Sequence, residues 1–330
     1  MMHIIDMHCD TLMAAAMKNV EDLSKADLRE MPGCSIDFAR LHEAKAMAQC
    51  FAIFFPPRQM FEQRMGGMSD EQYLAICHQV FTQSLERNTD LILQAKNAED
   101  VRRNFAAGKP SAILTIEDSR AVDGKLENIK RFYDMGVRAM SLTWNGANCI
   151  GFPNSKEPEL MAKGLTDFGK EAIVYMQELG ILVDVSHLSD GGFYDVAQIC
   201  KKPFVATHSN CRALSPHQRN LTDDMLKVLG DKGGVTGINF GSEFLSADIT
   251  SKDSLAKDMA AHARHMADKG GMDCVAMGTD FDGIGSNLEV DSPLKMGLLE
   301  DELKKVGFNE DEIEKIAYKN VLRVMDEAMK

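Results

Sequence analysis

The sequence predicts an α/β protein with a single (β/α)8 barrel, or TIM barrel, that carries insertions in its loops. The chain has 330 residues, a length that suits one large α/β barrel or two ordinary domains. Eight short β-rich runs alternate with longer amphipathic stretches. No Pro- or Ser-rich linker, low-complexity tract or charge block divides the chain, so we expect one domain over residues 1–330.

Most of the eight runs are near-continuously apolar, which is typical of parallel strands covered on both faces. They span residues 3–7, 48–55, 111–117, 138–143, 182–186, 204–207, 235–240 and 275–278. Eight strands that alternate with helices, over a length above the usual ~250 residues, match a barrel with insertions. The candidate insertions are residues 13–43, 56–69 and 145–164.

Helix boundaries between the runs are marked by capping residues. Ser69 stands three positions before Gln72, and Asn309 stands three before Glu312, which is the spacing of a capping box. Residues 166–179 form another amphipathic stretch, and the following glycine is expected to end that helix.

Composition narrows the class of protein. Hydrophobic residues make up 45% and charged residues 26%, and the formal net charge is −13, so neither nucleic acid nor an anionic membrane surface is an expected partner. No eighteen apolar residues run together and no secretory leader stands at the start, which favours a cytoplasmic protein. The eight cysteines form no C-x-x-C pair, and we expect free, mostly buried thiols.

The candidate site lies where the strands end, because the reactive groups of such barrels gather at the carboxyl ends of their strands. His8 and Asp10 follow the first run, Glu117 ends the third, and His187 and His208 follow the fifth and sixth. Each has an ordinary structural alternative: a hydrogen-bonded pair, a salt bridge of the carboxylate to a loop arginine, or a satisfied core histidine. Their coincidence at one rim favours a metal site instead.

Asp280 directly follows the last strand and is the candidate proton carrier. The alternative is that it caps the next loop, a role that Asp282 fits better. The segment 278–283 begins and ends with glycine, and small residues there allow close approach of the backbone.

Two carboxylates and three imidazoles form a ligand set that suits zinc and similar divalent ions. Five ligands are too many for one catalytic zinc. If Glu117 bridges, each of two ions receives three protein ligands and keeps an open position for water. The expected chemistry is therefore hydrolysis by a hydroxide that bridges two metals.

Six ordered motifs resemble the membrane (renal) dipeptidase family, which is peptidase family M19 of the amidohydrolase superfamily. They are D-M-H-C-D at 6–10, Glu117, D-V-S-H at 184–187, A-T-H-S-N at 206–210, R-N-L-T-D-D at 219–224 and G-T-D-F-D-G at 278–283. The resemblance spans nearly the whole chain, and it implies a (β/α)8 barrel and a binuclear zinc dipeptidase.

The resemblance also implies roles for single residues. His8 and Asp10 would bind one Zn²⁺ and His187 and His208 the other, with Glu117 between them. Arg219 would hold the carboxylate of a small dipeptide substrate, a task suited to its planar fork. Asn220 beside it is a further substrate-binding candidate. The family implies tolerance of a D-residue at the C-terminal position, and a homodimer would be in keeping with it.

One position departs from the best-known members of the family, which carry a histidine after the L-T of the fourth strand. Here Trp144 follows Leu142 and Thr143. The indole N–H could donate to the substrate in place of the histidine, the second zinc could act alone on the carbonyl, or Trp144 could be a pocket wall. The departure bears on the substrate range more than on the reaction.

Two other functions remain open from the sequence. One is a related amidohydrolase that acts on N-acyl amino acids or on another carboxylate-bearing amide or lactone. The other is a non-catalytic barrel used as a scaffold, which the complete ligand set and Asp280 disfavour. The remaining histidines are expected to be surface or structural residues, although His217, two positions before Arg219, could touch a substrate.

Overall fold

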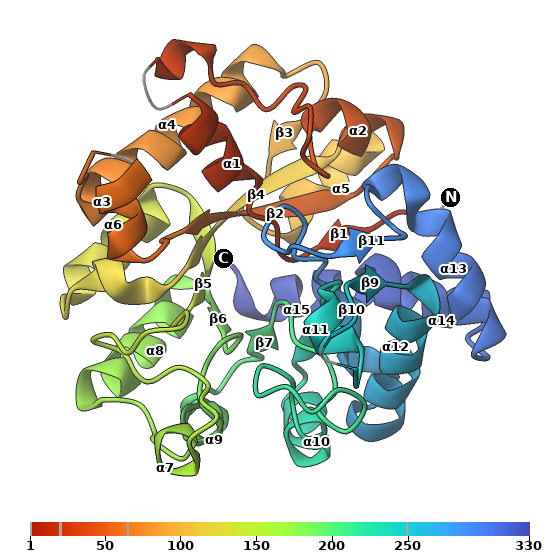
Figure 1. Cartoon of the computed structure of the whole chain (residues 1–330). Helices are drawn as coiled ribbons and strands as arrows, with labels where there is room; N and C mark the ends of the chain where they lie inside the picture. The colour runs from red at the N-terminus through yellow and green to blue at the C-terminus, as the bar shows by residue number, and fades with distance from the viewer. Residues whose placement is uncertain (1, 20–21, 65, 249) are drawn as a thin grey trace.

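Eight parallel strands close into a barrel in the computed structural model, which describes residues 2–19, 22–64, 66–248 and 250–330 (Figure 1). In order around the barrel they are β1 (Ile5–Asp6), β2 (Ala48–Phe54), β4 (Ser111–Glu117), β5 (Val137–Ser141), β6 (Leu182–Asp184), β7 (Val205–Ala206), β8 (Val235–Ile238) and β10 (Val275–Met277). Closure is direct, because β1 pairs with β2 on one side and with β10 on the other. The predicted (β/α)8 barrel is confirmed.

Helices surround this barrel on the outside (Figure 1). They are α1 (Thr11–Lys18), α2 (Phe38–Glu43), α3 (Arg58–Arg64), α4 (Asp70–Arg87), α5 (Ala98–Ala106), α6 (Leu126–Asp134), α7 (Pro158–Met161), α8 (Asp167–Leu179), α9 (Asp190–Ile199), α10 (Asp223–Asp231), α11 (Ser242–Leu245), α12 (Ala256–Gly270), α13 (Met296–Lys305), α14 (Glu310–Glu314) and α15 (Asn320–Ala328). The predicted insertion at 13–43 contains most of α1 and all of α2, the one at 56–69 contains α3, and the one at 145–164 contains α7. No helix among the described residues is long and apolar enough to cross a membrane.

The predicted caps are present. Ser69 and Asn309 each form a capping box with the residue three positions on. Thr166 accepts a hydrogen bond from the N–H of Gly169 at the start of α8, and Gly180 ends that helix with a φ of 89°. Glycine adopts this left-handed conformation without the steric cost that other residues meet.

Several strands are shorter than the sequence predicts, and short strands were missed. The run at 204–207 forms only the two residues of β7, because the next residue, Thr207, donates its N–H to the side chain of Asp184. The run at 3–7 likewise forms only β1. The missed strands are β3 (Leu93–Gln94), which pairs with the start of β4, and β9 (Asp253–Ser254) with β11 (Asn287–Leu288). Two-residue strands carry too little pattern to be recognised.

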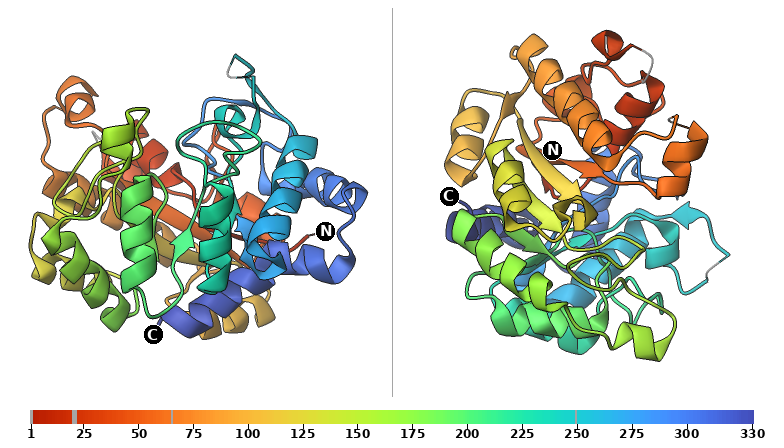
Figure 2. Two further views of the ribbon diagram at one scale, coloured as in Figure 1. Left: turned by 90° about the horizontal axis from the view of Figure 1, so that it is seen from below. Right: turned by 90° about the vertical axis from the view of Figure 1, so that its left-hand side faces the viewer.

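Two hydrophobic clusters make up the core. The larger lies between the barrel and its helices. The smaller fills the amino-terminal end of the barrel, where Ile5, Ile113 and Val235 from the strands meet Val324 and Met325 of α15. Figure 2 shows α15 lying across this end, opposite the loops that follow the strands. All eight cysteines are free thiols and six are buried, as expected.

Candidate active site

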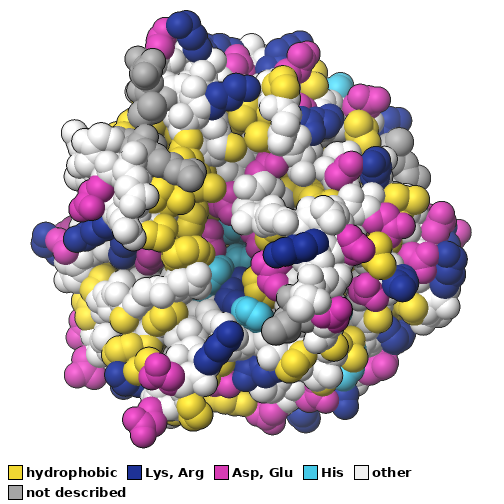
Figure 3. All heavy atoms as spheres, in the orientation of Figure 1, with side chains coloured by type: hydrophobic (Ala, Val, Ile, Leu, Met, Phe, Trp, Pro, Cys, Tyr) yellow, Lys and Arg dark blue, Asp and Glu magenta, His cyan; other side chains and the backbone are white. Residues whose placement is uncertain are grey.

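Polar side chains meet in a hollow at the carboxyl ends of the strands, and histidines are visible at its base (Figure 3). His8 follows β1, Glu117 is the last residue of β4, His208 follows β7 and Asp280 follows β10. His187 lies three residues beyond the end of β6. All are buried. The structure therefore brings these predicted site residues together.

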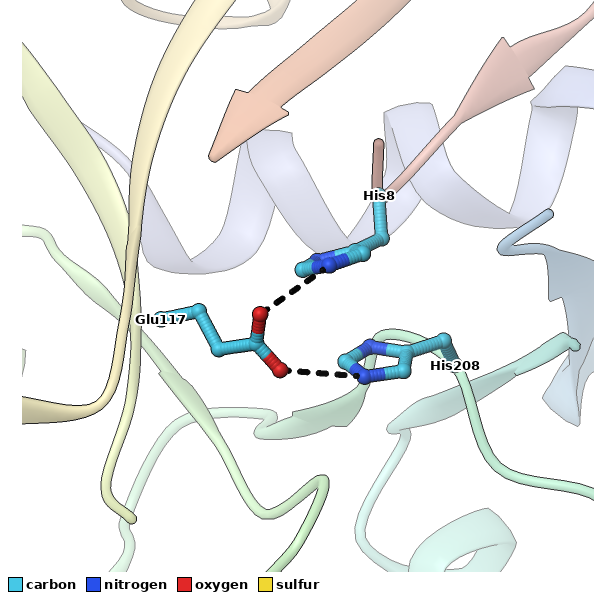
Figure 4. Close-up of side chains that lie close together, drawn as sticks. All are labelled: His8, Glu117 and His208. Carbon is cyan, nitrogen blue, oxygen red and sulfur yellow. Dashed lines mark ion pairs between the residues drawn. The ribbon is translucent and has the colours of Figure 1, made fainter. Parts of the chain in front are cut away.

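Glu117 lies at the centre of the group (Figure 4). Its Oε2 is 3.4 Å from Nε2 of His8. Its Oε1 is 2.9 Å from Nε2 of His187 and 3.5 Å from Nε2 of His208. The two oxygens of one carboxylate thus face different imidazoles, one from β1 and two from the opposite part of the rim.

Asp10 and Asp280 complete the group on the His8 side. Nε2 of His8 is 3.8 Å from Oδ2 of Asp10 and 3.7 Å from Oδ1 of Asp280. The other oxygen of Asp280 accepts a hydrogen bond of 2.8 Å from Nδ2 of Asn239, which follows β8. This bond fixes one oxygen of Asp280 and leaves the other directed at the cluster.

Burial and mutual repulsion shift the pKa values of the carboxyl groups. Burial, with repulsion from Glu117, raises the pKa of Asp10 to about 6. Burial is also the main cause that raises the pKa of Asp280 to about 7, and His8 opposes the rise. Burial works against ionisation of Glu117 too, but His8 and the two other imidazoles outweigh it and hold its pKa well below its usual range.

His187 and His208 are held in the neutral form. Burial, helped by the charge of Arg219, lowers the pKa of His187 to about 4. Burial, followed by the neighbouring His8, lowers the pKa of His208 well below its usual value. Their Nε2 atoms lie 3.1 Å apart. Neutral imidazole is the form that binds a metal ion.

The side chains present fit a divalent cation. Nε2 of His8 and Oδ1 of Asp10 are buried without a hydrogen-bond partner among the described residues, an arrangement that is costly unless something else binds there. Ligand atoms of His8, Glu117 and His208 all lie within 4.8 Å of one another, as do those of His8, Asp10 and Asp280. Carboxylate and imidazole together suit zinc-like ions.

A glycine leaves room for this arrangement. A Cβ added at Gly283 would overlap Oδ2 of Asp10 and would lie 2.7 Å from Oδ1 of Asp280. The sequence prediction that small residues at 278–283 permit a close approach is confirmed at this position.

Two site residues have strained backbone conformations. His187 has a φ of 69° and Asp280 a φ of 61°. Left-handed backbone costs a non-glycine residue of order 1–3 kcal/mol and clusters at functional sites. Asn154 donates from both its N–H and its side-chain amide to the carbonyl of His187, which helps to hold that residue in place.

Arg219 lies under a cavity of about 460 Å³ whose wall also includes His187, Lys156 and Glu243. Its guanidinium donates to Oγ of Ser209 at 3.1 Å and to the carbonyl of His208 at 3.2 Å. The bonds of its guanidinium among the described residues go to no carboxylate, and its Nε has no hydrogen-bond partner there. This buried cation therefore has capacity left for an anion.

Of the remaining predicted residues, only His217 lines this cavity among the described residues. Trp144 packs against Phe54 and His187, with ring centroids 5.0 and 6.1 Å apart, in the wall of a neighbouring cavity of about 440 Å³. Asn220 is buried and its amide donates to the carbonyls of Ser215 and Phe244, so these bonds join two loops. His217 lines the Arg219 cavity and accepts the N–H of Arg219.

Sequence reasoning passed over two side chains that contact the site. Asn239 binds Asp280, and Oδ1 of Asn145 lies 3.2 Å from Nδ1 of His187. Each follows a strand directly or within a few residues, so the rule of examining strand ends would have found both. Neither is ionisable and neither belongs to one of the six motifs, so only their position after a strand marks them.

The sequence model described as "Membrane dipeptidase (Peptidase family M19)" matches residues 1–330. The chain is 35% identical over 261 residues to an "Uncharacterized protein in pqqA 5'region" of Klebsiella pneumoniae, and this match covers 77% of the chain and 94% of the relative.

Solved structures agree with this match. A dipeptidase of metallopeptidase family M19 superposes with a TM-score of 0.87 at 26% identity over 99% of both chains. A metallopeptidase from Rhodobacter sphaeroides, in complex with a phosphinate mimic of the dipeptide L-Ala-D-Ala, gives 0.86 at 25% identity, again over 99% of both chains. With the family sequence model covering its full length, this chain belongs to the membrane dipeptidase family, peptidase family M19.

Proposed function

We propose that this protein is a zinc-dependent dipeptidase that hydrolyses the amide bond of small dipeptides, including those with a C-terminal D-residue. His8 and Asp10 would hold one Zn²⁺, His187 and His208 a second, and Glu117 would bridge them. When bound, such a metal pair lowers the pKa of water and polarises a carbonyl group. The complex of the Rhodobacter sphaeroides relative with a mimic of L-Ala-D-Ala supports this substrate class.

The orientation of Glu117 is the observation that carries the proposal. A bridging carboxylate must offer one oxygen to each of two ligand sets. Here one oxygen faces His8, and the other faces His187 and His208. A purely structural salt bridge would need only one of these partners. It would also not explain why Nε2 of His8 and Oδ1 of Asp10 are buried without a hydrogen bond among the described residues.

Asp280 would move the proton. Its Oδ1 faces the cluster, while Asn239 holds its other oxygen. As a carboxylate it would accept a proton from the attacking water, and as an acid it would return that proton to the departing amine nitrogen. The raised pKa of Asp280 suits a group that changes protonation state at neutral pH, and a bound cation would lower this value.

Arg219 would bind the free carboxylate of the substrate. It is buried, carries no carboxylate partner among the described residues and faces a cavity large enough for a small ligand. Its bond to the carbonyl of His208 would place the bound carboxylate at a fixed distance from the reacting amide. Trp144 would serve as a wall of the pocket, and Asn220 would hold the loops that present Arg219.

The test is a hydrolysis assay of the zinc-reconstituted protein with L,L-, L,D- and D,L-dipeptides beside matched N-acetyl amino acids. We expect release of free amino acids from dipeptides, and loss of that activity in Glu117→Gln. Glu71→Gln is the matched control, since Glu71 pairs with Arg131 at the surface. Hydrolysis of N-acyl amino acids but not of dipeptides would refute the proposed substrate class. A protein that binds no zinc and shows no hydrolysis would refute the proposal that it is an enzyme.

A further inference from the structure

Two buried carboxylates behind the metal-binding side chains form the same hydrogen-bonded arrangement at two places in the barrel. Asp6 ends β1 and Asp184 ends β6. Both are almost fully buried, and neither has a role in the reaction proposed above. We propose that they are positioning residues: each fixes a threonine just beyond the end of the neighbouring strand, and that threonine sets the placement of the site residue that follows it.

The first arrangement controls Asp280. Oδ1 of Asp6 accepts the N–H of Thr279 at 2.8 Å, and its Oδ2 accepts the hydroxyl at 2.7 Å. The hydroxyl oxygen of Thr279 also accepts the N–H of Phe281 at 3.2 Å. The threonine side chain thus spans Asp280 from one side to the other, at the residue where the backbone takes its strained φ of 61°.

The second arrangement controls His208. Oδ1 of Asp184 accepts the N–H groups of Thr207 and Ser186, both at 2.9 Å. Its Oδ2 accepts the hydroxyl of Thr207 at 2.6 Å, a length typical of a charge-assisted bond. Oγ1 of Thr207 lies 2.7 Å from Nδ1 of His208.

This geometry selects one tautomer of His208. The hydroxyl of Thr207 has a single hydrogen, and that hydrogen is donated to Asp184. Its oxygen must therefore accept from Nδ1–H of His208, which leaves the lone pair on Nε2, the atom that faces Glu117 and His187. A group that hydrogen-bonds to the ring nitrogen not used for the metal orients a ligating histidine. Loss of such a group typically weakens metal affinity 10- to 100-fold.

The two arrangements match in detail, which a chance buried polar contact would not do. In each, the carboxylate accepts both the N–H and the O–H of one threonine, as well as the N–H two residues after itself. The residues that they position differ, however. One ends at a proposed metal ligand and the other at the proposed proton carrier, so their loss should have different effects.

The inference rests on the proposed function and is tested with threonine variants of the full-length protein. Thr207→Val and Thr279→Val remove the hydroxyl and keep the shape. Ser111→Ala is the matched control, because the hydroxyl of Ser111 is buried in a hydrogen bond with Asn104 at the other end of β4. For each variant we would measure zinc affinity, kcat, KM and the melting temperature.

We expect Thr207→Val to weaken zinc affinity 10- to 100-fold, with kcat recovering in excess zinc. Thr279→Val should keep the zinc affinity and the KM, and its kcat should fall at least 10-fold. The serine variants should restore each property. If both valine variants behave like Ser111→Ala, with only the melting temperature changed, or if both lose zinc and kcat together, the inference is wrong.

A measurement on the protein without metal separates this inference from the proposed function. In ¹⁵N-histidine NMR spectra, His208 should appear as the Nδ1–H tautomer in the parent protein, and Thr207→Val should abolish that preference. An unchanged tautomer in the variant would overturn the proposed role of Asp184 and Thr207 even if dipeptides are hydrolysed. A parent protein that binds zinc but cleaves no dipeptide would reject the proposed function alone.

Discussion

Replacing Asp280 with asparagine tests the proposed proton transfer most directly. The change keeps the shape of the side chain, and the amide oxygen can still accept the hydrogen bond from Asn239. It removes the group that would take a proton from water and return it to the amine. General acid–base catalysis contributes about 10²- to 10⁴-fold to rate, so kcat should fall by that factor, equivalent to about 3–5 kcal/mol in the barrier.

The assay compares kcat and KM of the parent and the variant on one dipeptide, together with zinc content by elemental analysis. We expect an unchanged zinc content, since His8, Asp10, Glu117, His187 and His208 are all retained. A kcat within about threefold of the parent would remove Asp280 from the mechanism. Loss of one zinc per chain would instead make Asp280 a ligand, which its distance of 3.7 Å from His8 would also permit.

Three further substitutions test other parts of the site and the fold. Arg219→Ala should raise KM for dipeptides about 10- to 150-fold, the range for one charge-assisted bond, with little effect on dipeptide amides; equal losses on both would contradict the carboxylate role. Gly283→Ala should lower zinc affinity, measured by competition with a chelator, because the added methyl group overlaps Asp10; an unchanged affinity would place Asp10 outside the metal site. His262 is buried, and burial lowers its pKa to about 4. Below pH 6.5 the unfolded chain therefore binds more protons than the folded one, and stability decreases as the pH is lowered. Between pH 7 and 4.5 the free energy of unfolding of His262→Gln, measured in urea, should decrease by about 2 kcal/mol less than that of the parent; an equal decrease in both proteins would refute this.

The order of strands and helices could be predicted because each element carries its own local signal. Apolar runs such as 48–55 and 111–117 extend over β2 and β4, and the capping boxes at Ser69 and Asn309 begin α4 and α14 as predicted. Strand ends were less predictable. The ladder at β7 stops where Asp184 takes the N–H of Thr207, which depends on a residue more than twenty positions away.

Which side chains meet at the strand ends could also be predicted, but their orientation could not. His8, Glu117, His187 and His208 were recognised by their place after apolar runs, and the structure brings them together. Which oxygen of Glu117 faces which imidazole depends on the closure of the barrel, which no local pattern encodes. For the same reason the contact between Asn239 and Asp280, 41 residues apart in sequence, was missed.

The position of α15 makes the two ends of the chain depend on each other. This last helix buries Val321, Leu322, Val324 and Met325 in the cluster that also contains Ile5 of the first strand. At about 1.5–3 kcal/mol for each large apolar side chain, the helix contributes a sum comparable to the whole net stability of a typical domain. During synthesis the barrel therefore becomes stable only after the last helix has packed against the first strand. A deletion of a few carboxyl-terminal residues should for this reason inactivate the site at the opposite end of the barrel.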